Sequence, residues 1–152
     1  MTARLLAPVA VALLLVATGC GGKSEAEKQR EKGLEKAADR STCLADAKKV
    51  SSFPSGFPQD FPFPPKTVVF DTQDRGAGGV VATGITSLPF KEVLASLNGP
   101  AQQAGFKVTN GETEAHDAEA NWTGNGYRGR WAIRESASCA GETVVQVLAS
   151  KK

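Results

Sequence analysis

Apolar and polar residues alternate most regularly between Asp117 and Arg134, on either side of Asn125-Gly126. Asn-Gly is the preferred pair for a two-residue type I′ turn, so this pattern predicts a β-hairpin. The predicted turn pairs Thr123 with Arg128, Asn121 with Arg130, and Asp117 with Arg134. A shift of one residue would mix the two faces of the hairpin, so the alternation itself supports this register.

The predicted register gives the hairpin one apolar face and one polar face. The apolar face carries Ala118, Ala120, Trp122, Tyr127, Trp131 and Ile133. The polar face carries Asp117, Glu119, Asn121, Thr123, Arg128, Arg130 and Arg134, with Ala132 as its exception. Gly129 lies opposite Trp122, whose large ring can cover the missing side chain. We therefore expect the tryptophans in the core, although two tryptophans and a tyrosine would also suit a ligand-binding aromatic shelf.

The remaining apolar segments complete one domain over residues 66–152. Segments rich in β-branched or aromatic residues predict further strands at 67–70, 80–85, 106–108 and 143–149. A helix is predicted after the second of these, because its apolar residues follow a 3.6-residue period: Phe90, Val93, Leu94, Leu97, Ala101 and Ala104. We expect Ser87 to cap its start, Gly99-Pro100 to split it and Gly105 to end it. The predicted fold is α+β, an antiparallel sheet in the order β-β-α-β-β-β-β with this helix packed on one face.

A strap of unusual composition precedes this domain. Residues 51–65 contain four Phe-Pro pairs, which begin at positions 53, 57, 61 and 63. Proline blocks helix formation and restricts the residue before it, so an extended segment is expected. Four phenylalanines so close together would form a costly exposed patch, and we therefore expect them to pack on the domain. The alternative is a proline-rich ligand for an aromatic groove of another protein.

Residues 20–50 are interpreted as a charged helical tether. The run from Lys23 to Arg40 is rich in Glu, Lys, Gln and Ala, which favour a helix, and opposite charges recur at i,i+3 spacing. Ser24 and Glu27 form a capping-box pattern at its start. Apolar residues become frequent near Cys43, where we expect a docked helix. A coiled-coil partner helix is the less favoured alternative, because apolar residues are too sparse for a continuous seam.

The start of the chain has the parts of an export signal over residues 1–19. A short basic beginning is followed by an uncharged run over residues 5–17, which reaches about 20 Å as a helix, short of the roughly 30 Å hydrocarbon core. Ala17-Thr18-Gly19-Cys20 resembles the lipobox of bacterial prolipoproteins, although that motif usually has Leu where this chain has Ala17. The resemblance covers residues 1–20 and implies cleavage before Cys20, diacylglyceryl transfer to its sulfur and often N-acylation. These small residues would also suit the ordinary signal peptidase, which would release a secreted protein.

The number of cysteines fits a lipid-anchored protein. Cys20 would become a thioether, which leaves Cys43 and Cys139 as an even pair in an oxidising compartment. We therefore predict a disulfide between Cys43 and Cys139, with two unpaired buried thiols as the alternative.

Composition and motifs argue against several functions. The net charge of +2 gives no basic surplus to bind phosphates, so no nucleic-acid partner is expected. The one histidine, His116, lies in a polar connection, and a metal site with Glu114 and Asp117 would lack the several His or Cys ligands of zinc. The sequence contains no nucleophile elbow, Cys-x-x-Cys, phosphate-binding loop or His-Glu-x-x-His motif. We expect no enzyme, no cofactor and no metal.

Two candidate binding sites remain. Arg128, Arg130 and Arg134 form a basic row, which is either a solvated face with acidic cross-strand partners or a face that binds an anion, a lipid headgroup or a protein. An apolar pocket is the second candidate, lined by Trp122, Trp131 and Leu94.

The leading hypothesis is a lipid-anchored envelope lipoprotein that acts as a non-catalytic binding or accessory module. Its partners would be the membrane, through the lipid on Cys20, and an envelope protein or other envelope component. One alternative is a carrier or sensor of a lipid or apolar small molecule between helix and sheet. Another is an enzyme or inhibitor whose site carries no recognisable motif.

Overall fold

The computed structural model describes residues 42–152, which form an α+β fold around a six-stranded antiparallel sheet. The strands are β1 (Val68–Asp74), β2 (Val80–Thr86), β3 (Lys107–Thr113), β4 (Asp117–Gly124), β5 (Tyr127–Glu135) and β6 (Thr143–Lys151). The main helix is divided into α2 (Phe90–Asn98) and α3 (Pro100–Gln103), and a short turn of 3-10 helix, η1 (Gly76–Gly78), joins β1 to β2. The predicted order of elements is confirmed.

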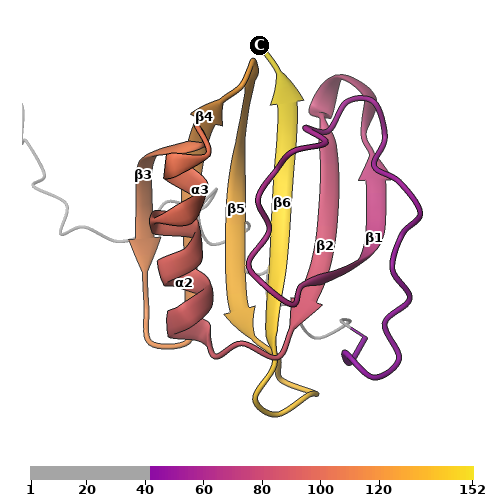
Figure 1. Ribbon diagram of the computed structural model, residues 1–152, viewed down its shortest axis with the longest axis vertical. Coiled ribbons are helices and arrows are strands. Elements are labelled where there is room, and N and C mark those ends of the chain that lie inside the picture. Colours follow the sequence, from indigo (N-terminus) through magenta and orange to yellow (C-terminus); the bar gives the residue numbers. More distant parts are fainter. Residues whose placement is uncertain (1–41) are drawn as a thin grey trace, which may run out of the picture.

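The order of strands across the sheet is β1-β2-β6-β5-β4-β3 (Figure 1). The last strand of the chain, β6, therefore lies in the middle of the sheet, where it pairs with both β2 and β5. Every neighbouring pair is antiparallel. All seven residues of β2 are buried, and seven of the nine residues of β5 are buried or half-buried.

One face of the sheet is covered by the helix and by the strap, and we call it the covered face. In Figure 1, α2 and α3 lie in front of the β3–β5 side, while the chain before β1 loops across β6, β2 and β1 on the same face. The two coverings meet in a single apolar cluster. It includes Phe57, Phe61, Val93, Leu97, Phe106, Trp122, Trp131 and Val147.

The strap lies on the domain, but its shape differs from the expected extended segment. Backbone hydrogen bonds from Phe57 to the Pro54 carbonyl and from Phe61 to the Pro58 carbonyl fold it into successive turns. The side-chain amide of Gln59 donates to the Phe57 carbonyl at 3.0 Å. These turns place Phe57 and Phe61, which are 0% and 6% exposed, in the core. Proline restricts its neighbours without forbidding turns, and burial of the rings decides the path of the chain.

The prediction of a docked helix near Cys43 is wrong, because the segment docks without forming a helix. Leu44, Ala45 and Asp46 make a turn, and no helix lies between Thr42 and Val50. Leu44 and Ala47 nevertheless dock, against Ile85 and Val144 on the face opposite α2. Such a short segment has little helical stability of its own, so its tertiary contacts determine its conformation.

The helix ends as predicted but begins differently. Gly105 has a φ of +94°, and the Phe106 amide bonds to the Ala101 carbonyl, which is a Schellman-type end. The expectation that Ser87 caps the start is wrong, because Pro89 precedes the first turn and no side chain caps it. The Thr86 hydroxyl instead accepts a hydrogen bond from the Leu88 amide at 3.2 Å.

Candidate functional site

The β4–β5 hairpin positions the arginine row. Its register is the one expected from the sequence, with Thr123 opposite Arg128 and Asp117 opposite Arg134. Asn125 and Gly126 have φ values of +48° and +82°, as a type I′ turn requires. Because alternate residues of a strand share a face, Arg128, Arg130 and Arg134 lie on one side of the sheet. We call this side the arginine face, and it is opposite the covered face.

The three arginines have different surroundings. The Arg128 side chain is exposed, whereas Arg130 and Arg134 are half-buried. The Arg130 guanidinium forms a salt bridge with Glu119, two residues away diagonally on β4. The expected cross-strand compensation is therefore present at Arg130, and an interaction across this distance is common in sheets. Arg128 offers the most accessible positive charge of the three.

An apolar strip runs beside the arginine row. Leu148 of β6 is the cross-strand neighbour of both Arg130 and Val81, so these three residues lie side by side on the arginine face. The polar pair Thr83 and Gln146 comes next along the two strands. Beyond it, Ile85 and Val144 form a second apolar cluster with Leu44, Ala47 and Phe70 around them. Val81, Ile85 and Val144 are buried, and Leu148 is half-buried, so the accessible part of the arginine face is mainly polar and charged.

The aromatic residues of the hairpin belong to the core. Trp122 and Trp131 are 2% and 3% exposed, and Leu94 of α2 packs against the same cluster. The Trp122 ring lies 5.3 Å from the Phe61 ring and 5.5 Å from the Phe106 ring, measured between centroids. This confirms the interpretation of the tryptophans as core residues over that of an exposed aromatic shelf. The Trp122 Nε1 atom is buried without a hydrogen-bond acceptor among the described residues.

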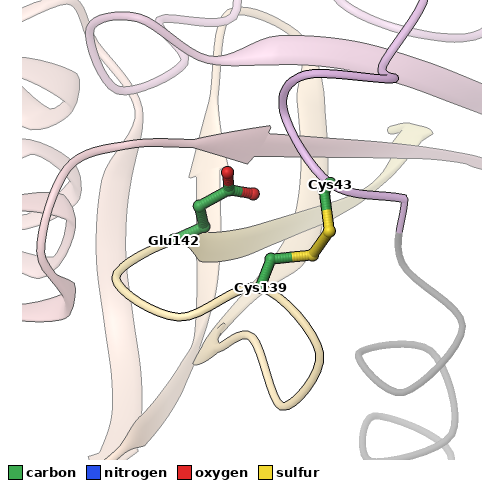
Figure 2. Close-up of side chains that lie close together, drawn as sticks. All are labelled: Cys43, Cys139 and Glu142. Atoms are coloured by element: carbon green, nitrogen blue, oxygen red, sulfur yellow. A yellow bond between two sulfur atoms is a disulfide. The ribbon is translucent and has the colours of Figure 1, made fainter.

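The predicted disulfide between Cys43 and Cys139 is present, with 5.6 Å between the two Cα atoms (Figure 2). It joins the segment before the strap to the loop between β5 and β6. Glu142 lies close by, and its Oε2 atom accepts a hydrogen bond from the Leu44 amide at 2.9 Å. No local pattern in the sequence indicates this contact, because the two residues are 98 positions apart.

Glu142 and the two cysteine sulfurs lie within 4.8 Å of one another, as the ligands of a metal ion would. Metal coordination requires thiolates, and here the two sulfurs are bonded to each other. The disulfide and the hydrogen bond from Leu44 therefore hold residues 43 and 44 against the loop that precedes β6.

His116 lies on the surface at the β3–β4 connection. Its side chain is 71% exposed, and its Nδ1 atom lies 2.8 Å from Glu135 Oε2, at the end of β5. This arrangement fits the expected surface histidine. The interaction links the β3–β4 connection to the end of the hairpin.

Comparisons with protein-family models, curated proteins and solved structures gave no match. The interpretation of the site therefore depends on the chain's own residues. The predicted signal peptide and Cys20 lie outside the described residues. Within residues 42–152, no helix has the length and apolar character needed to cross a membrane.

Proposed function

We propose that this chain is an exported lipoprotein, anchored through Cys20, that acts as a non-catalytic binding module and presents its arginine face to an envelope partner. The observation that carries the proposal is the row of arginines on that face, of which Arg128 is exposed, beside the half-buried side chain of Leu148. Arginine is one of the residues enriched where proteins bind one another. The lipobox-like sequence supports export and anchoring.

The anchoring part is tested by mass and by fractionation. The full chain is expressed in a bacterium with lipoprotein-processing enzymes, and the intact mass of the mature protein is measured. We expect a chain that begins at Cys20 with acyl mass added, and a Cys20→Ser variant that leaves the membrane fraction. A mature wild-type chain without acyl mass would indicate ordinary secretion and contradict the anchor.

The binding part is tested by site-specific photo-crosslinking in the producing cell. A photoreactive residue replaces Arg128 on the arginine face or, as the matched control, Lys91, an exposed residue of α2 on the other side of the sheet. We expect a defined product with another envelope component from position 128 and none from position 91. Equal products from both positions, or no intermolecular product from position 128, would contradict the proposal.

A second candidate function is favoured by one observation, the buried Trp122 indole N–H without an acceptor. Buried polar groups usually have partners, so a bound molecule that accepts this hydrogen bond would account for it. Such a molecule would make the protein a carrier or sensor of a lipid or other apolar compound. Native mass spectrometry of protein extracted from membranes should then show an additional small mass, reduced in Trp122→Phe and retained in Trp131→Phe. An unchanged mass in both variants, or no additional mass, would remove this candidate.

A further inference from the structure

Two of the three side chains in Figure 2 belong to one tight turn of the loop before β6. Cys139 and Glu142 are three residues apart, and the Glu142 amide donates a hydrogen bond to the Cys139 carbonyl at 3.1 Å. Gly141 has a φ of +79°, as the third residue of a type II turn requires. The Cys139 amide also donates to the Ser136 hydroxyl at 3.1 Å, and the Ser136 amide donates to the Glu142 carbonyl at 2.8 Å. These hydrogen bonds fix both residues without help from the disulfide.

The third side chain, Cys43, is also held by contacts other than the disulfide. The amide of its neighbour Leu44 donates to Glu142 Oε2 at 2.9 Å. The Leu44 side chain packs in the second apolar cluster, which is built on Ile85 and Val144. A few residues further along, the backbone of the same segment forms a hydrogen bond with β1. Reduction of the disulfide would therefore leave Cys43 beside the loop.

The three side chains offer the ligands of a thiophilic divalent cation. The two sulfur atoms and a carboxylate oxygen of Glu142 lie within 4.8 Å of one another. The ligand atoms of a tetrahedral zinc ion lie about 3.6–3.8 Å apart, so the reduced side chains need only small shifts to reach this arrangement. Zinc binds thiolates and carboxylates, and three protein ligands leave a fourth position for water. The spacing of Cys139 and Glu142 matches that of the first two ligands in many zinc sites, where two residues separate them.

We propose that reduction of the Cys43–Cys139 disulfide converts this group into a binding site for one zinc ion, with Cys43, Cys139 and Glu142 as its ligands. The reductant is a dithiol, which transfers two electrons and two protons to the disulfide and itself becomes a disulfide. Each cysteine sulfur is then a thiol. The zinc ion displaces both thiol protons into solvent as it binds the two sulfurs, and it neutralises two of the three negative charges of its ligands.

Metal binding at this site depends on the redox state of the chain. The bound ion and the disulfide exclude each other, because both use the same two sulfur atoms. Zinc favours the reduced form by mass action, since it binds that form alone. The site forms only where a dithiol reaches the disulfide, whose Cys43 half is half-buried and Cys139 half is buried. The inference does not depend on the partner proposed for the arginine face.

Zinc titration of the purified full chain tests the site. The chain carries Cys20→Ser, so that Cys43 and Cys139 are its remaining cysteines, and it has no polyhistidine tag. One sample in mild detergent stays oxidised, and another is reduced with a dithiol that is then removed without oxygen. Zinc binding is measured against a competing chromophoric chelator. We expect one zinc ion per reduced chain and none per oxidised chain. Zinc should also raise the denaturant midpoint of the reduced chain alone.

Two carboxylate variants separate the proposed ligand from its surroundings. Glu142→Gln removes the charge but keeps an oxygen that can accept the Leu44 hydrogen bond. It should weaken zinc binding to the reduced chain by more than about tenfold, a loss that even an indirect contact with a metal ligand can cause. The matched control is Glu135→Gln, just before the same loop, where the side chain is 51% exposed. This control should bind zinc as the unsubstituted carboxylate does.

Several outcomes would overturn the proposal. Absence of zinc binding by the reduced chain would show that the three side chains form no site. Equal binding by oxidised and reduced samples, or binding that persists in Cys43→Ser/Cys139→Ser, would assign the ion to other groups. Equal affinities of Glu142→Gln and Glu135→Gln would remove Glu142 from the ligands. A reduced chain that binds zinc without a rise in its denaturant midpoint would show that the ligands meet only after unfolding.

Discussion

At the scale of single residues, close contacts decide what the hairpin can tolerate. The Trp122 ring lies over Gly129, so that a Cβ atom added at Gly129 would be 2.7 Å from Trp122 Cζ2 and 1.9 Å from the Leu148 carbonyl oxygen. The glycine is therefore needed for close approach, since its own φ is not in the left-handed region. The sequence suggested this covering of Gly129 by Trp122 from the register alone.

The substitution Gly129→Ala should lower the free energy of unfolding by about 1–3 kcal/mol, because the added methyl group meets backbone that cannot move aside. Urea unfolding followed by tryptophan fluorescence would measure the loss. Gly78→Ala is the control, since an added Cβ there meets its nearest atom, Arg75 Cβ, at an ordinary 3.4 Å. Equal stabilities of the two variants would contradict the packing of Trp122 on Gly129.

At the scale of elements, the strap is an integral part of the domain. Phe57 stacks on Phe53 with 4.8 Å between ring centroids, and Phe61 reaches Phe106 at 5.1 Å. The strap therefore completes the covering of the β6–β1 side, which α2 and α3 do not reach in Figure 1. A sheet of this width needs both coverings to bury one face.

Truncation of Phe57 should therefore be as costly as truncation of a residue in the centre of the domain. Phe57→Ala should lower the free energy of unfolding by about 3–5 kcal/mol, as expected for a fully buried phenylalanine. Phe53→Ala should cost clearly less, because Phe53 is half-buried. Both values come from denaturant unfolding of the mature chain, and a loss at Phe57 no larger than that at Phe53 would show that the strap is peripheral.

At the scale of the whole molecule, one covalent bond closes most of the described chain into a loop. The disulfide spans 96 positions, from before the strap to the loop before β6. In the chain-entropy model a loop of this size stabilises the folded state by about 4–5 kcal/mol, because it restricts the unfolded chain. The disulfide also holds Cys43, which precedes the strap, against the loop before β6.

The Cys43→Ser/Cys139→Ser variant should accordingly unfold at a lower denaturant concentration than the wild-type chain, by an amount of this order. Wild-type protein treated with a reductant should unfold at the same concentration as the variant. Equal stabilities of the oxidised wild-type chain and the double variant would show that the disulfide adds no stability.

The sequence by itself determined those elements that are specified by residues close together in the chain. The Asn125-Gly126 turn and the alternation around it set the hairpin register, and the 3.6-residue period set the main helix with its division at Pro100. These features follow from backbone geometry and from the two side-chain periodicities, so neighbouring residues are enough to specify them. The cysteine pair was also predictable, because the predicted acylation of Cys20 would leave two cysteines to combine.

Only the tertiary structure decided where these elements lie relative to one another. The insertion of β6 between β2 and β5, the turns of the strap over the sheet and the contact of Leu44 with Glu142 all join residues far apart in the chain. The short helix expected near Cys43 did not form, because burial against Ile85 and Val144 outweighs the weak helical preference of a few residues. Local pattern fixes which side of a strand is apolar, but the choice of what covers it depends on packing across the whole domain.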